Sequence, residues 1–188
     1  MARRVAKTLG KSPTGSDSKT ANRLAHETRF SSSIDLPSAA RADMVALLNN
    51  RLADFLDLER QAKQAHWNVK GPRFHPLHLL FDDTAALAVK WADDIAERAM
   101  QLGGIAEGTV QVIAERTTLR PAPLVAPDAN TWIGVVTEAL ACCANAARKD
   151  IDTADDAGDA ITTDLLTRVT GEADKQLWFV EAHLQSAS

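Results

Sequence analysis

Four long stretches of this sequence repeat apolar residues at intervals of three and four, which is the spacing of one face of an α-helix. They run from Ser38 to about His66, from about Phe74 to Leu102, from Asp128 to about Asp155, and, after a break near Gly158, through Leu165 to Leu184. No stretch alternates apolar and polar residues strongly enough to predict a β-sheet. The sequence therefore predicts an all-α fold.

Local signals mark the ends of these helices. Gly71-Pro72 ends the first and Gly103-Gly104 ends the second. Ser38 and Asp128 are expected to cap the first and third helices. The longer connection between helices two and three contains a short helical candidate, Val110–Arg116. This order predicts a four-helix bundle of the ferritin-like kind, with a short extra helix in that connection.

Composition divides the chain into a flexible basic tail, residues 1–37, and a helical bundle domain, residues 38–188. The tail has too few apolar residues to offset the entropy of ordering. The first 30 residues carry seven basic side chains against two acidic ones, although the whole chain has a net charge of -4. This polarity is typical of sequence-nonspecific contact with DNA phosphates. A solvated tail or an organellar transit peptide is the alternative. The expected DNA-binding side chains are Arg3, Arg4, Lys7, Lys11, Lys19 and Arg23.

The sequence also bears on the compartment. No apolar run approaches the ~20 residues that span a bilayer, and the first residues lack the apolar stretch of a secretory signal. The adjacent Cys142 and Cys143 cannot form a disulfide framework and are expected to be small core residues. We therefore expect a protein of the reducing cytoplasm without a membrane partner.

The second helix carries two pairs of metal-binding residue types, each with a spacing of four: His78 with Asp82, and Asp93 with Glu97. At about 100° per residue, all four project from one side of the helix. Asp82 and Asp93 are ~16 Å apart along the axis, so they cannot bind the same ion. One chain alone is therefore expected to hold two half-sites.

These four residues are symmetric about the point between Leu87 and Ala88. If two copies of this helix cross antiparallel there, His78 and Asp82 of one chain face Glu97 and Asp93 of the other. Two identical sites per dimer would result. A pair of solvated charged patches is the alternative. Small residues beside the axis would permit close approach of the helices: Ala85, Ala86 and Ala88.

His66 extends the ligand set. It ends the first helix, and the turn containing Gly71 and Pro72 can return it toward His78. Two imidazoles and three carboxylates suit iron and similar divalent metals. A purely structural role for His66 is the alternative.

The segments His66–Gly71 (HWNVKG) and Asp93–Arg98 (DDIAER), together with Phe74, His78 and Phe81-Asp82, resemble the signature of the Dps family, the DNA-binding proteins from starved cells. The layout agrees over residues 38–186, including Leu177-Trp178-Phe179. The resemblance implies a hollow dodecamer, built from twofold dimers, that oxidises Fe(II), preferably with hydrogen peroxide, and stores ferric mineral. It implies that the catalytic and iron-binding residues are His66, His78 and Asp82 of one subunit with Asp93 and Glu97 of its twofold neighbour.

The resemblance also implies protection of DNA from oxidative damage by a cytoplasmic, nucleoid-associated protein. Because several relatives lack a basic tail and do not bind DNA, DNA binding rests on the tail's charge. Trp67 is a candidate redox neighbour that would quench a stray oxidising equivalent, and packing in the core is its alternative. We expect His75 to be structural.

Two further patterns leave alternatives open. Acidic residues at the junction of helices three and four could line a negative pore that attracts Fe(II), or they could be a solvated helix end with Asp159 as the cap. The absence of Glu-x-x-His argues against true ferritins and intrachain di-iron oxygenases. A non-enzymatic DNA-compacting protein and a zinc or manganese store are the competing functions. The acidic residues are Asp150, Asp152, Asp155, Asp156, Asp159 and Asp164.

Overall fold

The computed structural model describes residues 29–185, and within this range it contains five helices and no strand. Both the all-α prediction and the short extra helix are confirmed. Among the helices described, none combines the length and the apolar character needed to cross a bilayer. The tail side chains Arg3, Arg4, Lys7, Lys11, Lys19 and Arg23 lie outside the described residues. The helices are α2 (Ser38–Asn68), α3 (Phe74–Gln101), α4 (Val110–Arg116), α5 (Ala129–Asp156) and α6 (Ala160–Glu181).

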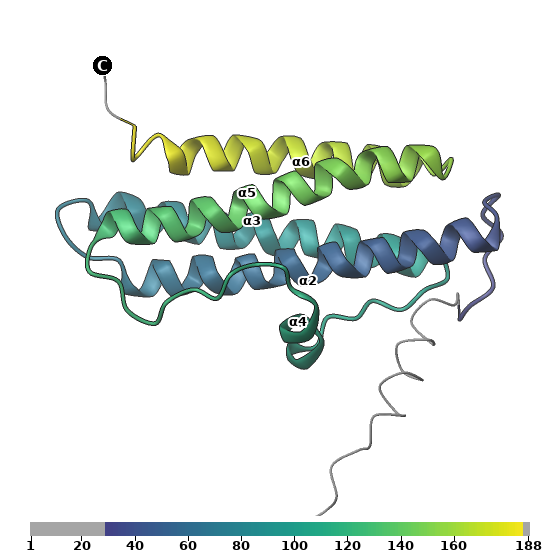
Figure 1. Ribbon diagram of the computed structural model, residues 1–188, viewed down its shortest axis with the longest axis horizontal. Helices are drawn as coiled ribbons and strands as arrows, with labels where there is room; N and C mark the ends of the chain where they lie inside the picture. The colour runs from purple at the N-terminus through teal and green to yellow at the C-terminus, as the bar shows by residue number, and fades with distance from the viewer. Residues whose placement is uncertain (1–28, 186–188) are drawn as a thin grey trace, which may run out of the picture.

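The four long helices form two hairpins that pack on each other (Figure 1). α2 lies along α3, and α5 lies along α6, while further contacts join α2 to α5 and α3 to α6. The connection between α3 and α5 returns along the length of the bundle and places α4 against α2. As a result, the turn between α2 and α3 lies at the same end of the bundle as the start of α5.

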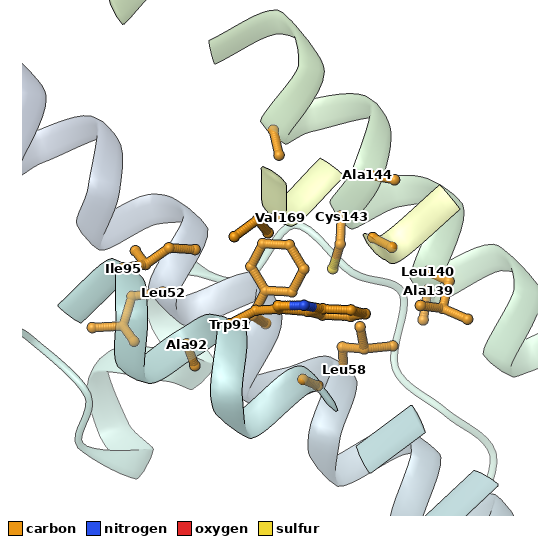
Figure 2. Close-up of a cluster of buried hydrophobic side chains, with 14 of the residues drawn as sticks. Leu52, Leu58, Trp91, Ala92, Ile95, Ala139, Leu140, Cys143, Ala144 and Val169 are labelled. Carbon is orange, nitrogen blue, oxygen red and sulfur yellow. The ribbon is translucent and has the colours of Figure 1, made fainter. Parts of the chain in front are cut away.

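The apolar faces of the long helices meet in one core centred on aromatic side chains. Phe55 of α2 and Trp91 of α3 are fully buried, with ring centroids 5.6 Å apart in an edge-to-face arrangement. Figure 2 shows Trp91 among apolar side chains that include Val169 and Cys143. Burial raises the pKa of the Cys143 thiol, which therefore stays protonated. Cys143 is a core residue, as predicted, and the half-buried Cys142 packs against the core.

Gly103 ends α3 and also fixes the segment that leads into α2. Its φ of +84° is a conformation that glycine adopts without strain. Its N–H donates to the Met100 carbonyl at 3.0 Å, in a Schellman motif. Its own carbonyl accepts hydrogen bonds from the N–H groups of Arg29 at 2.9 Å and Phe30 at 3.0 Å. The chain just before α2 therefore lies against the end of α3.

The predicted caps are correct for α5 and wrong for α2. The Asp128 carboxylate accepts a hydrogen bond from the Thr131 N–H at 2.8 Å, as expected for a cap. At α2, Pro37 takes the cap position with φ -53° and ψ 142°, and no side chain in the described range makes a capping bond. Because the proline ring fixes φ, the chain is already set for a helix that begins at Ser38.

Candidate metal centre

The turn after α2 brings His66 back against His78. Gly71, with a φ of +104°, allows the chain to reverse direction there. The two imidazole rings stack, with centroids 3.7 Å apart and planes at 21°. The end of α2 therefore supplies an imidazole to the start of α3, as the sequence predicts.

Each of these imidazoles is held by the main chain of the other residue. His66 Nδ1 lies 2.7 Å from the His78 carbonyl oxygen, and His78 Nδ1 lies 2.9 Å from the His66 carbonyl oxygen. A carbonyl oxygen only accepts, so both Nδ1 atoms must carry the proton and donate it. In the neutral rings, each Nε2 then keeps a free lone pair. This is the tautomer that binds metal ions in proteins, where the other ring nitrogen donates to a carbonyl or carboxylate.

Asp82 places a carboxylate one turn after His78. Its Oδ1 atom lies 3.9 Å from His66 Nδ1, and half of the Asp82 side chain is exposed. Three of the five predicted ligands, His66, His78 and Asp82, therefore lie together in one subunit.

Lys63 of α2 donates a hydrogen bond to one oxygen of the Asp82 carboxylate. Its Nζ atom lies 2.5 Å from Asp82 Oδ1. This hydrogen bond is the main reason that the pKa of Asp82 lies below its ordinary value; burial opposes the shift, and the charges of Lys63, His66 and His78 add to it. Lys63 is not among the site residues predicted from the sequence. Its position three residues before His66, on the same face of α2, is the signal that could have found it.

Asp93 and Glu97 stand apart from this cluster. Both are exposed. Within residues 29–185, no group of three or more His, Cys, Asp and Glu side chains is arranged to hold a metal ion. The distance along α3, ~16 Å between Asp82 and Asp93, keeps the pair His78–Asp82 separate from the pair Asp93–Glu97. A single subunit thus carries the predicted ligands as two incomplete sets.

The side of α3 that carries these acids also exposes apolar side chains. Leu79 and Val89 are each 48% exposed, and Met100 is 47% exposed. At about 100° per residue they project to the same side as Asp82 and Asp93. In the single subunit, this side of α3 therefore exposes apolar as well as acidic side chains.

Two of the three alanines near the symmetry point face the core and not the ligand-bearing side of α3. Ala85 and Ala88 are 3% and 0% exposed, so the expectation that they face a partner helix is wrong. They continue the buried stripe of Phe81 and Ala92, which follows the helical spacing of three and four. Ala86 is exposed and remains available on the ligand-bearing side.

Two other predicted residues lie on the surface near this cluster. Trp67 is 62% exposed, so the alternative that it packs in the core is wrong. Lys63 Nζ lies 5.8 Å from the centroid of its ring. The redox role of Trp67 stays a prediction. His75 is exposed, and its expected structural role also stays a prediction.

The acidic junction between α5 and α6 is only partly free to line a pore. Asp159 is 3% exposed, accepts a hydrogen bond from the Thr162 N–H, and pairs with Arg98 at 2.7 Å. Asp159 is therefore the cap of α6, which was one of the two alternatives predicted for this segment. Asp150 pairs with Arg51 at 3.0 Å. Four of the six acidic side chains remain exposed: Asp152, Asp155, Asp156 and Asp164.

Comparison with known proteins agrees with this architecture. The ferritin-like domain family matches residues 45–188. The structure of DpsC from Streptomyces coelicolor has a TM-score of 0.82 and 30% sequence identity, and the match covers 86% of this chain and 94% of that chain. The structure of Dps from Microbacterium arborescens in the high iron form has a TM-score of 0.73 and 29% identity, over 77% of this chain and 94% of that one. The fold is that of a ferritin-like protein.

Sequence similarity identifies a family within the ferritin-like proteins. The DNA protection during starvation protein of Agrobacterium fabrum is 41% identical over 154 residues, which are 82% of this chain and 95% of the relative. The chain belongs to the Dps family, the DNA protection during starvation proteins.

Proposed function

We propose that this protein oxidises Fe(II) at two sites that form between paired subunits, and that it stores the ferric product. The observation that carries the proposal is the reciprocal hydrogen bonding of His66 and His78, which leaves both Nε2 atoms unprotonated, with the Asp82 carboxylate 3.9 Å from the His66 ring. Imidazole nitrogen and carboxylate oxygen together suit iron. Asp93 and Glu97 of a twofold partner add the remaining two carboxylates.

Iron is the substrate of this reaction, and hydrogen peroxide is its preferred oxidant. Two Fe(II) ions give one electron each, and these two electrons with two protons convert one hydrogen peroxide into two water molecules. When both electrons are delivered together, no hydroxyl radical is released. The carboxylates then balance the additional positive charge of Fe(III). Trp67, exposed beside His66, is the proposed acceptor of a stray oxidising equivalent.

Related proteins support the wider role. The Agrobacterium fabrum relative is named for DNA protection during starvation, and the Microbacterium arborescens structure is of a high iron form. We extend the proposal to a hollow assembly of twelve subunits, in the cytoplasm and associated with the nucleoid. In this assembly the basic tails contact DNA phosphates without sequence preference, because many weak charge contacts add up on one particle.

The test is peroxide-dependent oxidation of Fe(II) by a variant that combines His66→Ala and His78→Ala. We expect oxidation to fall to the rate of protein-free buffer while the mass of the oligomer, measured by light scattering, stays unchanged. His75→Ala is the matched control, because it removes an exposed imidazole from the same end of α3 and should keep the wild-type rate.

Two outcomes would contradict the proposal. If the double variant oxidised Fe(II) at the wild-type rate, His66 and His78 would be excluded as iron ligands. Binding of zinc or manganese by the wild-type protein without any oxidation of Fe(II) would indicate a store for another divalent metal.

A further inference from the structure

An apolar hollow opens on the side of α3 that carries the acidic residues. It has a volume of about 260 Å³ and lies between α2 and α3. Leu52 and Leu56 of α2 form one wall, Val89 and Ala96 of α3 form another, and Ala106 and Gly108 of the connection after α3 also line the hollow. Among the residues of the described range that line it, Asp93 alone is charged. An apolar hollow that reaches a proposed iron ligand is therefore open in the single subunit.

Leu79 is an exposed projection on the same side of the same helix. It directly follows His78, and nearly half of its surface meets solvent. Leu79 and Ala96 are equally distant from the point between Leu87 and Ala88, about which the predicted ligands are symmetric. The rotation that brings Asp82 level with the partner's Asp93 thus also brings Leu79 level with the partner's Ala96 along the paired helices.

We propose that this hollow receives Leu79 of the partner subunit. The inference rests on the proposed twofold pairing and adds the contact that sets its register. The exchange is reciprocal, so each dimer contains two such contacts, each beside one Asp93. An apolar side chain seated there excludes water from one side of the metal site, and such an apolar shell controls solvent access to a bound metal.

A second copy of this chain is the occupant that the geometry favours. A twofold interface requires one surface to complement itself, so a projection and its seat must lie at symmetry-related positions of the same surface. Leu79 and the hollow beside Ala96 meet this requirement about the centre that also relates His78 to Glu97. An unrelated protein partner would not require that coincidence.

Disulfide trapping tests the register. In a chain that carries Cys142→Ala and Cys143→Ala, we combine Leu79→Cys with Ala96→Cys and oxidise the protein mildly. A disulfide requires Cα atoms within about 7 Å, so only the proposed register yields a covalent dimer on a denaturing gel. The matched control combines Leu79→Cys with Asp94→Cys, because Asp94 lies on α3 near Ala96 but pairs with Arg168 of α6. We expect no covalent dimer from the control.

A second measurement concerns the stability of the dimer. Leu79→Asp introduces a charge into the apolar seat and should raise the subunit dissociation constant at least tenfold, whereas Leu79→Met should change it less than threefold. An equal dissociation constant for the two variants would contradict the proposal that the hollow receives Leu79 of the partner subunit.

The outcomes separate this inference from the proposed function. If the protein oxidises iron and has the mass of an oligomer but the pair at 79 and 96 forms no disulfide, the seat is wrong and the iron site stands. If the unmodified protein stays monomeric and does not oxidise Fe(II), the proposed function fails, and the seat fails with it.

Discussion

His66 and His78 each donate an Nδ1 proton to the main-chain carbonyl of the other residue, at 2.7 and 2.9 Å. Both acceptors belong to the backbone. Replacing one histidine therefore removes one ring but leaves the acceptor for the other ring in place. This arrangement makes the two imidazoles separable by substitution.

The first prediction follows from that independence. His78→Ala should weaken binding of Co(II), used as a substitute for Fe(II) in calorimetry, at least tenfold, because one ligand is lost while the His66 ring keeps its hydrogen bond. The exposed neighbour His75 provides the control, and His75→Ala should keep the wild-type affinity. Equal losses in the two variants would point to a general disturbance of the start of α3.

The second prediction concerns Lys63, whose ammonium group contacts Asp82 at 2.5 Å. A divalent cation that binds Asp82 must displace this group or lie beside it. Lys63→Gln should therefore tighten Co(II) binding several-fold at neutral pH, and the gain should shrink as salt is added. Lys63→Arg keeps the charge and should resemble the wild type. Weaker binding by Lys63→Gln would mean that Lys63 assists the metal instead of competing with it.

The third prediction concerns acid stability. Trp91 donates its indole N–H to Glu172 at 2.7 Å, and this bond is the main reason that the pKa of Glu172 lies below its ordinary value. A lowered pKa in the folded state adds stability above the ordinary value of 4.5. This contribution is lost as the pH falls through the lowered pKa. Glu172→Gln can still accept the bond but carries no charge.

The unfolding midpoints of wild type and Glu172→Gln, followed by near-ultraviolet circular dichroism from about pH 7 to about pH 3, test this linkage. The wild type should be the more stable protein at neutral pH, and its advantage should shrink on acidification. Curves that stay parallel over this interval would exclude it.

The fourth prediction contrasts a buried ion pair with an exposed one. Arg98 contacts Asp159 at 2.7 Å and Thr162 at 3.0 Å, and both charged side chains are almost fully buried. Arg98→Ala should lower the free energy of unfolding by about 3–5 kcal/mol, because Asp159 is left buried without its counter-charge. Arg168 pairs with Asp94 at the surface, so Arg168→Ala should lower it by about 1 kcal/mol or less. Guanidinium unfolding at matched protein concentration measures both, and similar losses would refute the contrast.

The fifth prediction concerns the basic tail. Deleting residues 1–28 retains Arg29 and Phe30, which bond to Gly103, and removes the side chains expected to contact DNA. The truncated protein should lose its salt-sensitive gel shift with DNA but oxidise Fe(II) at the wild-type rate. A full-length variant with the tail's basic residues changed to glutamine should behave in the same way. A gel shift that survives both changes would locate DNA binding on the helical domain.

The helices could be predicted because the signals that define them are local. The apolar spacing, the Gly103-Gly104 end of α3 and the Asp128 cap each depend on residues within one or two turns. The same spacing places His78, Asp82, Asp93 and Glu97 on one side of α3. Ala85 and Ala88 are close to the symmetry point in sequence, but their helical angles direct them into the core, so the prediction for them is wrong.

Contacts between helices were less accessible from the sequence. Lys63 meets Asp82 across a separation of 19 residues, and this contact depends on how the turn at Gly71 sets α2 against α3. The tautomer of His66 and His78 depends on the same alignment, because the acceptors are carbonyl groups of the neighbouring helix. Neither the Lys63–Asp82 contact nor the histidine tautomer produces a periodic pattern in the sequence.

In the proposed dimer, the length of α3 fixes the distance between the two iron sites. This helix contributes ligands to one pocket near its start and to the other pocket near its end, so the gap between the pockets is fixed by the number of helical residues that separate Asp82 from Asp93. One inserted residue there would lengthen this gap by about 1.5 Å and rotate one ligand pair by about 100° relative to the other. Both pockets would be spoiled by a single-codon insertion that touches neither, so this stretch should tolerate substitution far better than any change in length.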